Sequence, residues 1–404
     1  MSVSATISRT KLRRAAELKV RRCEDNSLPY VGLENVESKT GRYLEGVNEM
    51  PDAVANEFVP GDVLFGKLRP YLAKSLAPEF HGRCSGELLV LRPKCLDARF
   101  LHYWLLSDET ISAVSASTYG AKMPRADWDF IGNLEIPTPP LPTQRRIAAY
   151  LDRETAQIDA LVAEKETLLG LLEEKRASLI SHAVTRGLNP KAKLKPSGIP
   201  WLGDVPGHWS VLPLKRLTTT IKTGSTPNTD DVTVEGDFDW YTPGDFGYDI
   251  HLSPSKRRIF RESASFDSLR IFPVGTILFV GIGATLGKCS VALTGCSANQ
   301  QINAIVPTRE TDSVFLCLSL RAQAEGIRLM ANASTIGILN QERTSAIPIA
   351  VPPPAEQSAI AAECLRISTA TDRAIAEIQT SITLLREKRS SLVSAAVTGE
   401  MAVP

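Results

Sequence analysis

The apolar positions of this chain follow two patterns that alternate along its length. Short apolar runs bounded by glycine or proline, such as Asp62–Phe65 and Glu87–Leu91, predict strands in the first part of the chain. A helical pattern follows at about 98–114. From Thr143 to about Arg186 proline and glycine nearly vanish, and apolar residues recur at steps of three, four or seven: Ile147, Leu151, Ile158, Leu161, Leu168, Leu172 and Leu179. This pattern predicts an amphipathic helix of about 44 residues, roughly 65 Å long at 1.5 Å per residue.

The same order returns in the second half. Residues 188–200 are rich in glycine, proline and lysine, which predicts a linker. Residues 201–355 have the mixed, strand-like texture of residues 1–142, and a second long apolar stripe follows in 356–404. The predicted order is therefore a globular domain, a long helix over 143–187, a linker, a second globular domain and a second long helix.

One segment of the sequence is present twice. Residues 136–185 align without a gap on residues 349–398, at a constant offset of 213 positions (349 against 136). The globular regions resemble each other only faintly. We therefore infer that the two helices share one function, whereas the two globular domains perform different versions of a common function. Two stripes of equal length are expected to pack antiparallel, whereas two unrelated surface helices would be too long to bury on small domains. The matched positions include Pro139-Pro140 with Pro352-Pro353, Gln144 with Gln357, and Glu174-Lys175-Arg176 with Glu387-Lys388-Arg389.

Composition narrows the class of protein. The formal net charge of the 404 residues is +1, so bulk charge does not indicate nucleic acid, although cations cluster at 9–22 and 256–261. The seven cysteines are scattered and odd in number, which favours reduced thiols in a cytoplasmic protein over disulfides or a zinc site. The uncharged stretches 271–287 and 289–308 contain proline, glycine and polar amides, so they predict buried strands and no membrane span.

The sequence contains no complete catalytic motif. Gly281–Lys288 resembles a phosphate-binding loop, but three residues rather than four precede the Gly-Lys pair and Cys289 follows it. The sequence has no Asn/Asp-Pro-Pro-aromatic motif of an adenine methyltransferase, and no carboxylate cluster typical of a nuclease. The missing motifs favour a binding or assembly role.

A specific combination of motifs then points to a family. The second half opens on Trp201-Leu-Gly and Pro206-Gly-His-Trp209, and each half leads into its helix through Ile-Pro, Pro-Pro, Gln and Ile-Ala. Over essentially its whole length the chain resembles the specificity (S) subunit of type I restriction–modification enzymes. The resemblance implies an α+β fold: two globular mixed α/β target-recognition domains, separated by two long helices that pack as an antiparallel coiled coil, with a pseudo-two-fold internal repeat.

The resemblance also implies a function. Each globular domain would read one half of a bipartite double-stranded DNA target, while the coiled coil sets the spacing and docks two methyltransferase (M) subunits. The chain itself would be non-catalytic and hold no cofactor; S-adenosylmethionine, ATP and Mg would belong to the M subunits and to restriction (R) subunits, and no membrane would be involved. One departure stands out: the first half lacks the Trp-Leu-Gly and His-Trp motif and has Thr143 before its glutamine, where the second half has Glu356.

The chemistry of the loop side chains indicates which residues would contact DNA. Base edges are read by Arg, Lys, Asn and Gln, while hydroxyl and main-chain groups contact phosphates. The first domain offers two loops, Gly66–Tyr71 and Tyr119–Arg125, and the second offers the loops around Lys222, Trp240, Asn299 and Ser334. The candidates are Lys67, Arg69, Tyr71, Tyr119, Lys122 and Arg125 in the first domain, and Lys222, Ser225, Trp240, Tyr241, Gln300, Gln301 and Thr335 in the second.

Three alternatives remain open at this point. The chain could be an assembly scaffold whose coiled coil is its function and whose domains bind no DNA. It could be a nucleotide-dependent enzyme centred on Gly281–Lys288. It could also be an orphan specificity subunit that has lost its partners.

Overall fold

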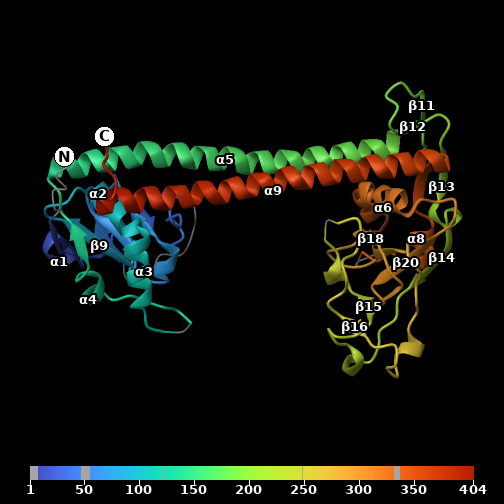
Figure 1. Ribbon diagram of the computed structural model, residues 1–404, viewed down its shortest axis with the longest axis horizontal. Coiled ribbons are helices and arrows are strands. Elements are labelled where there is room, and N and C mark those ends of the chain that lie inside the picture. Colours follow the sequence, from blue (N-terminus) through green and yellow to red (C-terminus); the bar gives the residue numbers. More distant parts are fainter. Residues whose placement is uncertain (1–7, 47–54, 121, 248, 332–336) are drawn as a thin grey trace. The chain divides into compact units, whose positions relative to one another are not determined.

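The computed structural model describes residues 8–46, 55–120, 122–247, 249–331 and 337–404. The chain forms two compact units (Figure 1). Unit 1 comprises Met1–Thr167 and Glu377–Pro404, and unit 2 comprises Leu168–Ala376. Two long helices, α5 (Leu141–Arg186) and α9 (Pro354–Thr398), each contribute to both units.

The globular part of unit 1 is built on two four-stranded sheets, with strand orders β2-β9-β6-β7 and β3-β5-β8-β4, while β1 pairs antiparallel with β10. The expected strands at Asp62–Phe65 and Glu87–Leu91 are confirmed as β6 and β9. The strands are β1 (Arg9–Lys11), β2 (Ala16–Lys19), β3 (Arg22–Cys23), β4 (Tyr30–Val31), β5 (Ala55–Phe58), β6 (Val63–Gly66), β7 (Ser75–Leu76), β8 (Gly82–Ser85), β9 (Leu88–Pro93) and β10 (Glu135–Pro137).

The single helix expected at 98–114 is two helices. Ser107 has an extended backbone (φ −65°, ψ 147°), and its hydroxyl donates to the Trp104 carbonyl at 2.7 Å, which closes the first helix. Asp108 and Glu109 then favour a new helix start, because acidic residues complement the helix dipole in the first turn. The helices of the globular part are α1 (Leu12–Ala15), the 3₁₀ turn η1 (Pro70–Leu72), α2 (Ala98–Leu106), α3 (Asp108–Ala116) and α4 (Trp128–Ile131).

Unit 2 contains a four-stranded sheet of order β14-β20-β17-β18, a three-stranded sheet of order β16-β15-β19, and the pairs β13-β21 and β11-β12. The buried strands expected within 271–308 are confirmed as β17 to β20. The strands are β11 (Leu194–Pro196), β12 (Asp204–Pro206), β13 (Ser210–Pro213), β14 (Thr218–Thr223), β15 (Phe238–Tyr241), β16 (Arg258–Ile259), β17 (Ile277–Val280), β18 (Cys289–Val291), β19 (Cys296–Ala298), β20 (Ile302–Pro307) and β21 (Pro348–Val351).

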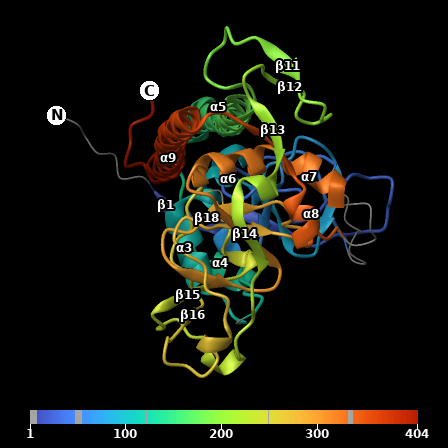
Figure 2. The same ribbon diagram turned by 90° about the vertical axis from the view of Figure 1, so that its right-hand side faces the viewer.

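Short helices cover the sheets of unit 2. Figure 2 shows α6, α7 and α8, of which α6 packs on β18 and α8 on β14. Within the described residues no helix is long and apolar enough to cross a membrane. The helices are α6 (Ser313–Ala322), α7 (Ala324–Ala331) and α8 (Gln341–Ser345), with 3₁₀ turns η2 (Leu214–Arg216), η3 (Thr229–Asp231), η4 (Pro243–Asp245) and η5 (Phe266–Ser268).

The long helices α5 and α9 contain 46 and 45 residues. Each begins two residues earlier than expected, and Pro142 lies inside the first turn of α5, where the missing N–H costs no hydrogen bond. In unit 1 Ile147 and Leu151 near the start of α5 share a core with Val393 and Val397 near the end of α9. In unit 2 residues 183–184 of α5 pack with residues 360–364 of α9. In both units, therefore, the start of one helix meets the end of the other.

The duplicated glutamines share two contacts, and Gln144 also donates to the Cys95 carbonyl at 3.3 Å. The Gln144 side chain accepts from the Asp97 N–H at 2.8 Å and donates to the Pro139 carbonyl at 2.8 Å. The Gln357 side chain accepts from the Asp312 N–H at 3.0 Å and donates to the Pro352 carbonyl at 3.0 Å. Asp97 and Asp312 cap α2 and α6. Each glutamine thus joins a long helix to the first helix after the central sheet of its own globular part.

Two ion pairs also repeat at the same offset. Arg176 on α5 donates to Asp372 on α9 at 2.6 Å in unit 2, and Arg389 on α9 donates to Asp159 on α5 at 2.9 Å in unit 1. Positions 159 and 176 correspond to 372 and 389 in the repeat. The duplicated sequence therefore encodes a reciprocal pair of charged contacts between the helices.

The sequence departure at Thr143 has a structural reason in unit 2. Glu356, which occupies the matching position, accepts from His208 Nε2 at 2.8 Å and from Trp209 Nε1 at 3.2 Å. Trp209 is buried, so its indole N–H needs an acceptor. The first half lacks the His-Trp motif, so its helix start has no such donor to satisfy.

The predicted linker is also partly ordered. Residues 194–196 form β11, which pairs antiparallel with β12. This pairing gives the lysine-rich part of the predicted linker regular structure.

Candidate nucleic-acid interface

The two candidate loops of unit 1, predicted separately, lie against each other. The Ala126 N–H donates to the Lys67 carbonyl at 2.9 Å, and the Arg69 N–H donates to the Pro124 carbonyl at 2.7 Å. Tyr119 and Arg125 exchange two main-chain hydrogen bonds at 3.1 Å, which closes the second loop. We call the resulting surface, formed by residues 66–72, 119–120 and 122–125, the unit 1 loop surface.

A concavity of about 300 Å³ borders this surface. Lys67, Tyr119 and Arg125 line it, together with Lys19 and Asn56, which the chemistry-based choice of loops missed. Lys19 belongs to the basic cluster at 9–22, but no sequence pattern placed it beside the loops. These five side chains are of the kinds that hydrogen-bond to base edges and phosphates, while the rest of the lining is mostly apolar and includes one carboxylate, Asp127.

The Arg125 guanidinium is held in one orientation. Its Nε donates to Glu87 Oε2 at 3.1 Å and its Nη2 donates to Glu87 Oε1 at 2.9 Å. These hydrogen bonds, with the carboxylate charge, raise the pKa of Arg125. A guanidinium paired in this way offers a pre-oriented edge and little free positive charge.

The remaining unit 1 candidates do not line the concavity. Arg69, Tyr71 and Lys122 are exposed on the loops beside it. Tyr71 is 52% exposed and Tyr119 is 63% exposed, which is high for aromatic side chains. Arg69 adopts a left-handed backbone (φ +49°) directly before η1. These residues add two exposed cations and an exposed aromatic ring to the unit 1 loop surface.

Unit 2 also brings two predicted loops together. The Ser225 N–H donates to the Ala298 carbonyl at 2.7 Å, and the Thr226 hydroxyl donates to Gln300 Oε1 at 2.9 Å. Lys222, Gln300 and Gln301 are exposed, and Ser225 is half-buried. Residues 222–226 and 299–301 therefore form the unit 2 loop surface.

One cation at the unit 2 loop surface was missed. The Arg270 N–H donates to the Ser225 hydroxyl at 2.8 Å, and its Nη1 donates to the Thr223 carbonyl at 2.6 Å. Arg270 is exposed but lies 45 residues away in sequence, in a segment without periodicity. No sequence signal connects it with Ser225.

The prediction that Trp240 and Tyr241 contact DNA from an exposed loop is corrected by their place in a buried strand. All four residues of β15 are buried, so this strand is covered on both faces. The Trp240 Nε1 donates to the Ser225 carbonyl at 2.9 Å, and the Tyr241 hydroxyl donates to the Ser253 carbonyl at 3.0 Å. Burial raises the pKa of Tyr241. Both side chains support the loop from inside and cannot reach a base edge, so they leave the candidate set. Ser334 and Thr335 lie outside the described residues.

The Gly281–Lys288 segment is a turn between antiparallel strands. The Val280 N–H donates to the Lys288 carbonyl at 2.8 Å, and β18 pairs antiparallel with β17 directly afterwards. A phosphate-binding loop instead leads into a helix, whose N-terminus binds the anion. The local structure therefore agrees with the expected inter-strand loop and gives the nucleotide hypothesis no support.

The basic cluster at 256–261 is largely neutralised. Arg257, Arg258 and Arg261 lie within 3.6, 3.1 and 3.4 Å of carboxylate oxygens. Their partners are Asp245, Asp239 and Asp237, which makes the cluster mainly structural. Among the described residues no group of His, Cys, Asp and Glu could hold a metal ion.

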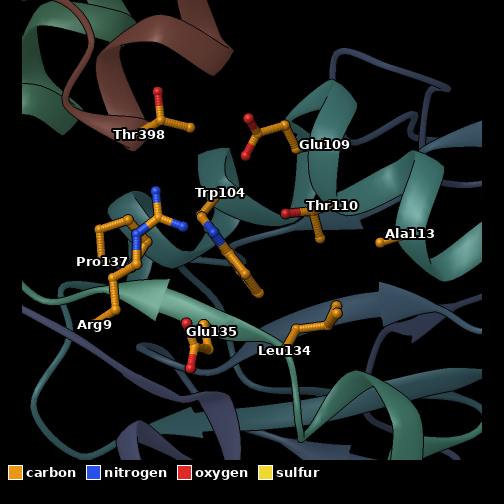
Figure 3. Close-up of a pocket in the computed structure, with 9 residues that line it drawn as sticks. All are labelled: Arg9, Trp104, Glu109, Thr110, Ala113, Leu134, Glu135, Pro137 and Thr398. Atoms are coloured by element: carbon orange, nitrogen blue, oxygen red, sulfur yellow. The ribbon is translucent and has the colours of Figure 1, made fainter.

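A second concavity in unit 1, of about 250 Å³, has a different character (Figure 3). Trp104 and Arg9 line it, but Glu109 and Glu135 face it from α3 and β10. Two carboxylates would repel a phosphate backbone. The concavity beside the unit 1 loop surface is therefore the better candidate for DNA.

Comparison with known proteins identifies the family. The family model described as "Type I restriction modification DNA specificity domain" matches residues 79–169 and 206–383, which is more than half of the chain. The chain belongs to this family. Its two matched regions cover parts of both globular regions and of both long helices.

Individual relatives in the specificity family are distant. The chain is 26% identical over 152 residues to the type I restriction enzyme EcoDI specificity subunit of Escherichia coli, a match that covers 37% of this chain. That match spans only about a third (34%) of the relative's own length.

Solved structures support the fold over the whole chain. A chain from "Structural basis underlying complex assembly and conformational transition of the type I R-M system" has a TM-score of 0.80 at 19% identity, covering 99% of this chain and 100% of that one. The crystal structure of the HsdS subunit from Thermoanaerobacter tengcongensis has a TM-score of 0.59 at 19% identity, covering 99% of both chains. At these identities the likeness concerns the fold of the specificity family and not the recognised sequence.

Proposed function

We propose that this chain is the DNA sequence-recognition subunit of a type I restriction–modification complex, and that it reads a bipartite target. The single observation that carries the proposal is the presence of two different polar loop surfaces, one in each unit, on globular parts joined to duplicated helices by the same glutamine contacts. The two globular parts are attached to the helices in the same way but carry different loops, as expected if they read two half-sites of different sequence.

The residues divide by expected role. Lys67 and Arg125 would contact base edges from the concavity of the first target-recognition domain (1–142), and Gln300 would do so in the second (201–355). The exposed cations would contact phosphates, whose contacts position a protein on DNA without carrying sequence information. The phosphate group comprises Arg69, Lys122, Lys222 and Arg270, with Tyr71, Tyr119, Ser225 and Gln301 as further contacts.

The long helices have the second role in this proposal. As an antiparallel coiled coil with pseudo-two-fold symmetry they would set the spacing between half-sites and dock two M subunits. Exposed leucines support docking, because isolated surface leucines are ordinary but a run along one helix indicates a partner. Leu161, Leu168, Leu171 and Leu179 on α5 are 42% to 56% exposed. Catalysis, with S-adenosylmethionine, ATP and Mg, would belong to the M and R subunits.

Genome-wide adenine methylation tests the proposal. A host would express the chain with its methyltransferase subunit, and the methylome would be sequenced with and without the chain. We expect a split motif of two short half-sites to be methylated only when the chain is present. An assembled complex without any chain-dependent motif would instead favour the assembly scaffold that binds no DNA.

Point variants localise the reading surface. Lys67→Ala removes a lysine from the concavity and should weaken binding to the target roughly tenfold to a hundredfold, the cost of about 1–3 kcal/mol for a specific contact. Lys191→Ala, which removes an exposed lysine from the turn after α5, is the matched control. Binding to a duplex that carries the methylated motif would be titrated at fixed salt. Equal affinities of the two variants would exclude Lys67 from the interface.

A further inference from the structure

Arg389, in the last third of α9, is a charged residue that is only 8% exposed. Besides its bond to Asp159, its Nη1 donates to the Lys39 carbonyl at 3.0 Å and its Nη2 donates to the Thr40 carbonyl at 3.5 Å. Its repeat counterpart Arg176 hydrogen-bonds only to Asp372 within the part of the chain that the structure describes. An ion pair between α5 and α9 is therefore present in both units, whereas the hydrogen bonds from the arginine to main-chain carbonyls of the globular part are described only in unit 1.

The turn at residues 39–41, whose carbonyls Arg389 contacts, packs closely against the globular part of unit 1. Lys39 and Gly41 have left-handed backbones, with φ of +68° and +70°. A Cβ on Gly41 would lie 2.3 Å from both the His102 Cε1 atom and the Ser75 carbonyl oxygen. This position therefore requires glycine for its close approach to α2 and β7 as well as for its φ.

The same turn also contacts the end of the loop 66–73, which belongs to the unit 1 loop surface. The Lys39 N–H donates to the Ala73 carbonyl at 2.9 Å, directly after η1. Ala73 and Arg69, which flank η1, both have left-handed φ, of +48° and +49°. Non-glycine residues adopt this conformation only where the surroundings hold them. The bond from Lys39 to Ala73 holds this conformation on one side and the bond from Arg69 to Pro124 on the other, while further main-chain bonds anchor the start of the loop at Gly66 and Lys67.

We propose that Arg389 is a positioning residue for sequence recognition: from the helix α9 it fixes the turn 39–41, and through the Lys39–Ala73 bond it fixes the loop 66–73 that faces DNA. The reading role of the loop rests on the proposed function, but the mechanical link does not. A movement of α9 against the globular part of unit 1 would break the carbonyl contacts and weaken the Lys39–Ala73 bond, which is one of the bonds that hold the loop of Arg69 and Tyr71. Recognition of the first half-site thereby depends on the position of α9 against the globular part of unit 1.

Hydrogen–deuterium exchange of the full chain tests the link without DNA. Arg389→Met keeps the aliphatic length and removes every donor, and Arg176→Met is the matched control, because it removes only the ion pair. We expect amides in 37–42 and 66–73 to exchange at least tenfold faster in Arg389→Met and at the wild-type rate in Arg176→Met. Wild-type exchange at 66–73 in Arg389→Met, or equal acceleration in both variants, would overturn the proposal.

A gentler variant covers the case in which Arg389→Met does not fold. Arg389→Lys keeps the charge beside Asp159, but a single ammonium cannot reproduce the forked contact with two carbonyls. We expect a smaller acceleration at 37–42 and 66–73, with wild-type exchange in the helices. Unchanged exchange at both segments in this folded variant would contradict the link equally well.

Methylome sequencing then tests the consequence for recognition. Where the wild-type chain directs methylation of a split motif, Arg389→Met should relax the preference at the half-site read by the first domain and leave the other half-site unchanged. A uniform loss at both half-sites would indicate a merely structural role and refute the positioning role. Where even the wild-type chain directs no motif, the proposed function fails, and the exchange experiment alone decides the link.

Discussion

At the scale of single residues, His102 shows how burial sets protonation. It lies inside unit 1, where its Nδ1 is 3.1 Å from the Ser75 hydroxyl. Burial, together with the nearby charge of Arg389, lowers the pKa of His102 to about 4. The folded protein therefore holds a neutral imidazole, whereas the unfolded chain takes up a proton below about pH 6.5.

The sign of the pH dependence follows. Between about pH 6.5 and 4 the unfolded state binds more protons, so the free energy of unfolding should fall with falling pH by up to about 1.4 kcal/mol per unit. His102→Gln should flatten this slope, while Gln157→Ala, a change without a titrating group at an exposed position on α5, should keep it. Urea unfolding between pH 7 and 5 measures the slopes. Identical slopes for wild type and His102→Gln would show that His102 is not the titrating group.

Glu356 is a second residue whose role is local. Glu356→Ala would leave the buried indole N–H of Trp209 without its acceptor, which should cost about 1–3 kcal/mol of stability. Thr143→Ala changes the matching position of the repeat, where no His-Trp motif exists, and should stay within about 0.5 kcal/mol. Thermal unfolding compares the two variants. A larger loss for Thr143→Ala would contradict the explanation of the sequence departure.

At the scale of elements, the repeat predicted more than any single motif. The recurrence of apolar residues at steps of three and four predicted both long helices, because this spacing places the apolar residues along one face of a helix. The break at Ser107 was missed because a serine followed by acids can either end a helix or lie on its exposed face. Trp240 was misjudged because its strand, β15, is buried on both faces, and composition alone does not reveal that.

The loop surfaces could be predicted only in part. Chemistry selected Lys67 and Arg125, but their adjacency depends on a hydrogen bond between Ala126 and Lys67, residues far apart in sequence. Arg270 and Asn56 were missed for the same reason. Local patterns carry periodicity and turn chemistry, whereas the meeting of distant loops is decided by how strands pair.

The glutamine contacts give a prediction at this scale. Gln144→Ala and Gln357→Ala each leave a main-chain N–H and a proline carbonyl without their partner at a buried site, and Gln144→Ala also removes the longer bond to the Cys95 carbonyl. Each should cost about 2–4 kcal/mol, and the two costs should agree within about 1 kcal/mol if the junctions are equivalent. Chemical unfolding of both variants gives the values, with Gln157→Ala on the surface of α5 as control. A cost confined to one variant would argue against equivalent junctions.

At the scale of the whole molecule, helix length should set the spacing of the DNA target. A seven-residue insertion in each of α5 and α9 keeps the apolar stripe in phase and lengthens each helix by roughly 10 Å at 1.5 Å per residue. Under the proposed function the spacer between half-sites should grow by about three base pairs at 3.4 Å each. Methylome sequencing would reveal the new motif. Methylation of the original spacing by a folded, lengthened chain would refute the spacing role of the helices.

The glutamine junctions have a consequence for how such a protein changes over generations. The hydrogen bonds of Gln144 and Gln357 described above all go to main-chain N–H and carbonyl groups. A main-chain partner is the same whatever side chain the position carries, so these hydrogen bonds place little demand on the sequence of the domain they hold. A gene that exchanged one domain for a divergent one by recombination would keep these junctions intact. Under the proposed function, a new recognition specificity would then arise in one step, without compensating mutations in the helices.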